Sequence, residues 1–200
     1  EAAEFGAIRL GHCTALGLDP AVAIARQAQA HTSEPASERL AQIRYDLDHR
    51  AELEHFAISI DSAALEKEME VVAALPGDEA VHRAYDPERL ATIRRRQDYV
   101  LNRLAELDVV IETCPTSNLR IGAVPNAQAH PIHRFLASNV KLAIGADDPG
   151  IFDSTLADEV DWVDRHTSMG TDALQMRLGD PHNYRLGLRR TGARSPAQTH

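Results

Sequence analysis

Three short apolar segments limit the folds open to this chain more than anything else in its sequence. They lie at residues 7–10, 107–112 and 140–144, and each stops abruptly at polar residues. Short apolar runs that alternate with helical patterns are typical of βα units, whose strands pair in parallel. The sequence therefore predicts an α/β fold with a parallel sheet.

The region between the first two apolar segments carries clear helix signals. Two helices begin at an Asp-Pro pair, in which Asp19 or Asp86 is the capping carboxylate and the proline suits the first helical position. Further helices are expected over residues 37–55 and 62–75. We therefore expect residues 21–106 to be almost entirely helical. Because a βα connection is usually far shorter, this region is interpreted as a large helical insertion or an elaborated crossover.

Composition and charge narrow the class of protein. A chain of 200 residues suits one domain, and at 44% hydrophobic it can bury a core. The net charge of -9 argues against a nucleic-acid or membrane-surface partner, and no apolar run is long enough to span a bilayer. The two cysteines have no zinc-binding spacing, and we expect them to be reduced thiols in a cytoplasmic protein.

Polar residues that can do chemistry follow each predicted strand. His12 follows the first strand, residues 113–118 follow the second, and Asp147 and Asp148 follow the third. Parallel βα units place functional groups at the carboxyl ends of their strands, so these residues are expected to converge. A histidine and two carboxylates suit metal-assisted or general acid–base hydrolysis. The alternative for the aspartates is a plain turn or helix cap before Pro149.

Several motifs at these strand ends resemble those of the adenosine and AMP deaminase family. AIGADDP at residues 143–149 resembles the signature of that family, RLGH at residues 9–12 its sixth-strand motif, and ETCPTSN at residues 112–118 its seventh-strand motif. The pairs His130-Pro131 and Thr155-Leu156 also stand where the family has them. The CPTSN wording is closer to nucleoside deaminases than to AMP deaminases.

The resemblance implies the fold of a TIM (β/α)8 barrel. This chain would supply its C-terminal portion, as three βα units resembling strands six to eight with a large helical insertion at about residues 21–106. Residues 1–185 would form this partial barrel domain, and residues 187–200 a polar, disordered tail. Because a complete barrel typically needs about 250 residues, and the chain begins at Glu1 rather than Met, a fragment or truncated product is expected.

The resemblance also implies a catalytic zinc ion and the roles of the strand-end residues. Asp147 would bind zinc, Asp148 would hydrogen-bond the attacking water and the purine, and His12 would orient or deprotonate that water. The resulting reaction is the conversion of adenosine to inosine and ammonia by attack at C6. Three more residues are expected to support the ligands or to contact the substrate: Ser117, Asn118 and Gly11.

Part of the family's metal site is missing from the sequence. The family also holds zinc with an H-x-H pair and a further histidine, and this chain has no H-x-H. Alone it should therefore bind zinc poorly, because one carboxylate is far short of four ligands. We expect it to need the N-terminal half of the barrel as a partner, and a homo-oligomer stays open.

Two other functions remain alternatives at this point. The chain could be a catalytically incomplete, deaminase-like module whose helical region serves assembly or partner binding. More distantly, it could belong to another amidohydrolase-type barrel that acts on a different amine-bearing ring. His130 and His133 have the i, i+3 spacing of a metal-binding pair, but we expect a loop and a helix start there.

Overall fold

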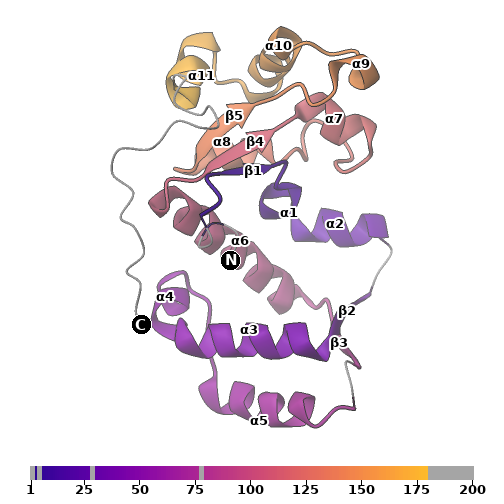
Figure 1. Cartoon of the computed structure of the whole chain (residues 1–200), viewed down its shortest axis with the longest axis vertical. Coiled ribbons are helices and arrows are strands. Elements are labelled where there is room, and N and C mark those ends of the chain that lie inside the picture. The colour runs from indigo at the N-terminus through magenta and orange to yellow at the C-terminus, as the bar shows by residue number, and fades with distance from the viewer. Residues whose placement is uncertain (1–2, 4–5, 28–29, 77–78, 180–200) are drawn as a thin grey trace.

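Three strands form the parallel sheet that the sequence predicts. In the computed structural model they are β1 (Arg9–Gly11), β4 (Val110–Thr113) and β5 (Lys141–Ile144), in the order β1-β4-β5 (Figure 1). The α/β prediction is confirmed, and the architecture is compatible with part of a TIM barrel. The structure describes residues 3, 6–27, 30–76 and 79–179. The tail expected at residues 187–200 lies outside this part of the chain.

Helices cover the sheet and connect its strands. The crossover from β4 to β5 contains α7 (Pro115–Arg120) and α8 (Ile132–Ala137). Beyond β5 follow three more helices: α9 (Pro149–Phe152), α10 (Leu156–Thr167) and α11 (Thr171–Leu178). None of the helices in the described part of the chain is both long and apolar enough to cross a membrane.

The main hydrophobic core lies between the sheet and these helices. Side chains of β4 and β5 are buried against α6 (Pro87–Glu106), α8, α10 and α11. Ile111, Phe135 and Leu142 are fully buried in this cluster. The central strand β4 is the most buried of the three, with Val110, Ile111 and Thr113 all covered.

The first two helices after β1, α1 (Thr14–Gly17) and α2 (Pro20–Gln27), lie beside the sheet (Figure 1). The chain that follows them forms a separate lobe, drawn at the bottom of Figure 1. Its elements, with α6 at its boundary, are β2 (His31–Pro35), α3 (Ala36–Asp48), α4 (Arg50–His55), α5 (Ser62–Ala73) and β3 (Ala80–Ala84). Its own small core gathers Leu53, Ile58 and Ile60 around Tyr99 of α6. The helix α6 therefore joins both cores, because its Leu101 and Leu104 pack on the sheet side.

The expectation that residues 21–106 are almost entirely helical is wrong in one respect. Strands β2 and β3 pair antiparallel as a two-stranded ribbon, with His31 opposite Ala84 and Pro35 opposite Ala80. Polar and charged residues fill much of this ribbon, so it lacks the apolar runs that mark the other strands. Cross-strand contacts such as Arg83 Nε to Glu34 Oε1, 2.8 Å, support it instead.

The structure confirms both helix starts that were predicted at Asp-Pro pairs. Asp86 Oδ1 accepts a hydrogen bond from the backbone N–H of Arg89 at 2.7 Å, with Pro87 at the first position of α6. Asp19 Oδ1 accepts one from the N–H of Ala21 at 2.9 Å in front of α2. Each carboxylate satisfies a donor that the helix itself cannot, which fixes where the helix begins.

Candidate active site

The carboxyl ends of the three parallel strands bring the predicted residues to one edge of the sheet. The register places Gly11 opposite Glu112, and Thr113 opposite Ile144. His12 therefore leaves β1 beside the residues that follow β4, and Asp147 leaves β5 on their other side. The convergence expected from parallel pairing is present in the structure.

The backbone is left-handed just after β1 and again after β5, the two strands that flank β4. His12 has φ 56°, Cys13 φ 49° and Asp147 φ 58°. Residues other than glycine rarely adopt this conformation, which costs about 1–2 kcal/mol each. Such strain persists only where surrounding contacts hold it, and it clusters at functional sites. Here it directs the side chains of His12 and Asp147 toward each other.

One oxygen of Asp147 is the centre of the cluster. Ser117 Oγ donates a hydrogen bond to Asp147 Oδ2 at 2.6 Å, and His12 Nε2 lies 3.8 Å from the same oxygen. Ser117 is buried, whereas the side chains of His12 and Asp147 are partly exposed. The cluster therefore offers a carboxylate and an imidazole to a ligand while a buried hydroxyl holds the carboxylate in place.

The opposite side of the His12 ring contacts a buried amide. His12 Nδ1 lies 2.8 Å from the Asn118 side-chain oxygen, and the Asn118 side-chain nitrogen lies 3.2 Å from His130 Nε2. The backbone N–H of Ile132 donates to His130 Nδ1 at 3.0 Å. Burial lowers the pKa of His130 to about 4, with a smaller effect from His133, so this ring is neutral at pH 7.

The sequence did not single out Glu159, which supports the same loop. Its side chain is 1% exposed in α10. Glu159 Oε2 accepts the backbone N–H of Thr116 at 2.9 Å, and its Oε1 accepts the hydroxyl of Ser154. This carboxylate therefore ties α10 to the segment that carries Ser117. The only signal in the sequence is its place in the acidic first turn after the Thr155 cap, where an exposed glutamate is the ordinary expectation.

The two adjacent aspartates separate in the structure. Asp148 Oδ1 caps α9 by accepting the N–H groups of Gly150 at 2.9 Å and Ile151 at 3.1 Å, and the residue is exposed. The plain capping alternative thus describes Asp148 in this structure, and its catalytic role stays a prediction. Gly11 ends β1, and a Cβ at this position would meet nothing within 4 Å.

The cysteines at neighbouring strand ends are both free thiols. Burial is the main cause that raises the pKa of Cys114 to about 11, and the nearby Glu112 and Asp147 carboxylates add to it. Burial also raises the pKa of Cys13. Neither thiol is therefore activated as a nucleophile.

Within the part of the chain that the structure describes, no three His, Cys, Asp or Glu side chains are arranged to hold a metal ion. Asp147 fits one position of a zinc site, because a carboxylate oxygen is a suitable ligand and this one is partly exposed. His130 and His133 have separate hydrogen-bond partners: His133 Nε2 bonds Ala127 O at 2.9 Å, and His130 bonds Asn118 and the N–H of Ile132. They lie in a loop and a helix start, as expected.

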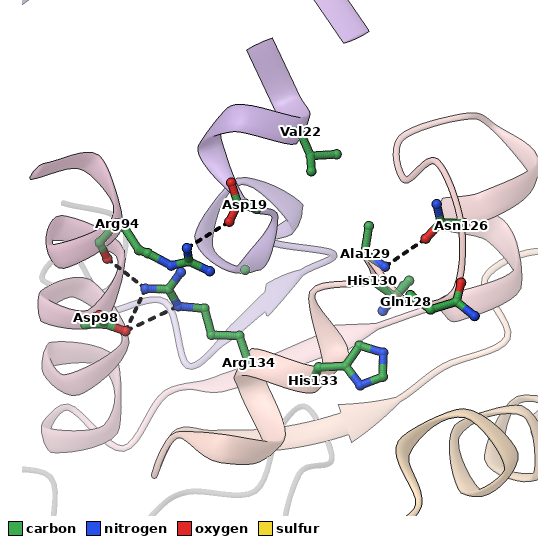
Figure 2. Close-up of a pocket in the computed structure, with 11 residues that line it drawn as sticks. Asp19, Val22, Arg94, Asp98, Asn126, Gln128, Ala129, His130, His133 and Arg134 are labelled. Atoms are coloured by element: carbon green, nitrogen blue, oxygen red, sulfur yellow. Dashed lines mark hydrogen bonds and ion pairs between the residues drawn. The ribbon is translucent and has the colours of Figure 1, made fainter. Parts of the chain in front are cut away.

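A separate open pocket lies between α2, α6 and the loop before α8 (Figure 2). Its charged side chains neutralise each other: Arg94 pairs with Asp19 at 2.9 Å, and Arg134 pairs with Asp98 at 2.7 Å. His12, Ser117 and Asp147 do not line it. The pocket and the cluster around Asp147 therefore have different linings.

Comparison with known proteins identifies a family for half of the chain. The family model described as adenosine deaminase matches residues 78–177, half of the chain. An aminodeoxyfutalosine deaminase of Acidothermus cellulolyticus is 33% identical over 98 residues, which cover 49% of this chain and 24% of the relative.

Two further relatives share shorter stretches. An adenine deaminase of Rhizobium leguminosarum bv. trifolii is 40% identical over 60 residues, 30% of this chain and 19% of the relative. An adenosine deaminase of Plasmodium gallinaceum is 35% identical over 60 residues, 30% of this chain and 17% of the relative. The matches thus span a quarter or less of the length of these curated relatives.

Proposed function

This chain belongs to the adenosine deaminase family, and from that premise we propose that it carries part of the site of a zinc-dependent purine nucleoside deaminase. The reaction is the hydrolysis of the C6 amine of adenosine: water adds at C6, ammonia leaves, and inosine results. One observation carries the proposal. Asp147 Oδ2 is held by Ser117 Oγ at 2.6 Å and faced by His12 Nε2 at 3.8 Å.

In this proposal the residues of the cluster have distinct roles. Asp147 is one ligand of the zinc ion, and the Ser117 hydroxyl fixes the orientation of its carboxylate. His12 Nε2 lies 3.8 Å from that carboxylate, and its proposed role is to orient the attacking water. A bound zinc ion would lower the pKa of water toward about 7, which makes a nucleophile available at neutral pH.

Asp148 is the second carboxylate of the proposed site. Its role is to hydrogen-bond the attacking water and the purine, for which its exposed side chain is accessible. The cap contacts to Gly150 and Ile151 both use Oδ1. They hold the carboxylate at the start of α9, one residue from the proposed zinc ligand.

The rest of the proposed site comes from protein beyond the described residues. Zinc in proteins is almost always held by three or four ligands, and these residues supply Asp147 with one neighbouring imidazole. We propose that β1, β4 and β5 correspond to the sixth, seventh and eighth strands of a (β/α)8 barrel, with the lobe between β1 and β4 as an insertion. The remaining strands would bring the other ligands. The two free thiols favour a reducing compartment, so the proposal places the enzyme in the cytoplasm.

The test is metal analysis and an ammonia-release assay on the full-length protein with adenosine and adenine. The proposal expects zinc near one per chain and turnover of adenosine. Asp147→Ala should lose zinc and activity together, whereas Asp148→Ala should keep the metal and lose most of the rate. Turnover of adenine alone would keep the reaction class but refute the nucleoside assignment.

A second candidate function rests on the incomplete ligand set. Because no three metal-binding side chains converge in the described part of the chain, a deaminase-like module without catalysis is the alternative, with the lobe as its assembly surface. An intact protein with neither zinc nor turnover would favour it. Turnover of an amine on another ring would favour the more distant amidohydrolase alternative.

A further inference from the structure

Three side chains, all buried or partly buried, form a hydrogen-bonded row that leads away from the proposed site. His12 Nδ1 lies 2.8 Å from the amide of Asn118, and the other end of that amide lies 3.2 Å from His130 Nε2. Asn118 is fully buried and His130 is 2% exposed. Water therefore cannot readily replace a missing donor or acceptor, and each contact must pair one proton with one lone pair.

His130 determines the direction of the hydrogen bonds among these three side chains. Its Nδ1 accepts the N–H of Ile132 at 3.0 Å, a backbone group whose position is set by the start of α8. The ring is packed edge-on to Trp162, with centroids 5.3 Å apart. A neutral imidazole carries one proton, and Nδ1 is already an acceptor, so the proton of His130 is on Nε2. The lowered pKa of His130 agrees with a neutral ring.

The proton on His130 Nε2 determines how the Asn118 amide is oriented. If the amide nitrogen faced His130, two N–H groups would oppose each other, and a buried donor would be left unpaired. The oxygen and nitrogen of an asparagine amide occupy nearly equivalent positions. With the amide turned by 180°, its oxygen accepts from His130 Nε2 and its nitrogen donates to His12 Nδ1. The His12–Asn118 and Asn118–His130 contacts then each join one donor to one acceptor.

We propose that His130 is a positioning residue that, through the Asn118 amide, holds the ring proton of His12 on Nε2. His12 Nδ1 is then an acceptor, and its Nε2–H faces Asp147 Oδ2 at 3.8 Å. The consequence for catalysis rests on the proposed function. In the neutral ring His12 donates a hydrogen bond on the side of the site and cannot accept a proton there, so of its two predicted roles it orients the attacking water.

The direct test is the tautomer of each histidine in the full-length protein, read from two-bond ¹H–¹⁵N couplings in ¹⁵N-histidine-labelled samples at pH 7.5. The proposal expects the wild-type His12 and His130 both to be protonated on Nε2. A proton on Nδ1 of either ring overturns it, and this result needs no variant. The readout is independent of zinc and turnover, so inactive protein with the expected tautomers refutes only the proposed function.

Two substitutions test whether His130 is the cause. His130→Phe removes the donor, so Asn118 can turn either way and His12 should show a mixture of both tautomers. His130→Gln can restore an N–H toward Asn118 and should return His12 to the Nε2–H form. His133→Phe is the matched control, because His133 bonds Ala127 O and does not contact Asn118. A folded His130→Phe protein with an unchanged His12 tautomer overturns the role of His130. Should His130→Phe fail to fold, the wild-type protein and His130→Gln provide the test, and a His12 proton on Nδ1 in either one overturns the proposal.

Discussion

Replacing Glu159 should destabilise the fold and loosen the site together. This buried carboxylate accepts two hydrogen bonds, from the Thr116 backbone N–H and from the Ser154 hydroxyl. Hydrogen bonds to charged groups contribute about 1.5–3 kcal/mol each. Glu159→Ala removes both acceptors and leaves the buried Ser154 hydroxyl without its partner. The free energy of unfolding should therefore fall by about 3–6 kcal/mol.

Glu159→Gln separates the hydrogen bonds from the volume of the side chain. The amide keeps one oxygen acceptor but turns an NH₂ group toward the second donor, so about half of the loss is expected. Chemical denaturation of the full-length protein measures both changes. Asp161→Ala is the matched control, because this carboxylate is exposed on the same helix. A Glu159→Ala variant no less stable than Asp161→Ala would refute the reasoning.

Three further predictions concern packing, pH and thiol reactivity. Gly145→Ala should unfold at a lower denaturant concentration, because its Cβ would lie 2.5 Å from Glu112 Oε1 and 3.2 Å from Cys114 Sγ; an unchanged midpoint would contradict this. The pKa of His130 is lowered to about 4 from 6.5, so the unfolded chain binds a proton that the native one does not. Stability should fall as pH drops from about 6.5 toward 4, with a shallower slope in His130→Gln; equal slopes in the two proteins would contradict this. Cys114, with a pKa of about 11, should react with iodoacetamide at pH 8 far more slowly in the native protein than after unfolding. Mass spectrometry measures the fraction of modified Cys114 over time, and equal rates would refute its burial.

The parallel sheet was predictable because its strands carry a strong local signal. Continuous apolar runs such as residues 107–112 and 140–144 stop at polar residues, and the Asp86-Pro87 pair marks the start of α6. These features depend on near neighbours in the chain. The β2–β3 ribbon was not predictable in the same way, because its pairing depends on contacts between residues about fifty positions apart, such as Arg83 and Glu34.

The candidate site likewise contains residues that the sequence could identify and one that it could not. Its polar residues could be found because parallel strands bring their carboxyl ends together, which accounts for His12, Ser117 and Asp147. Glu159 could not, because its burial depends on a loop 43 residues earlier in the chain. The capping of α9 by Asp148 was open from the sequence alone, since one aspartate before a proline suits both a cap and a catalytic carboxylate.

The placement of the lobe has a consequence for how the molecule assembles. Arg9 in β1 pairs with Val110 in β4 across about a hundred residues, whereas β4 and β5 pair across about thirty. Bringing distant segments together costs conformational entropy that grows with the length between them, and non-local pairing slows folding. The lobe shortens that distance when its own core forms first. We therefore expect β1 to join an already formed β4–β5 pair, and its amide hydrogens to become protected from exchange after those of its neighbours.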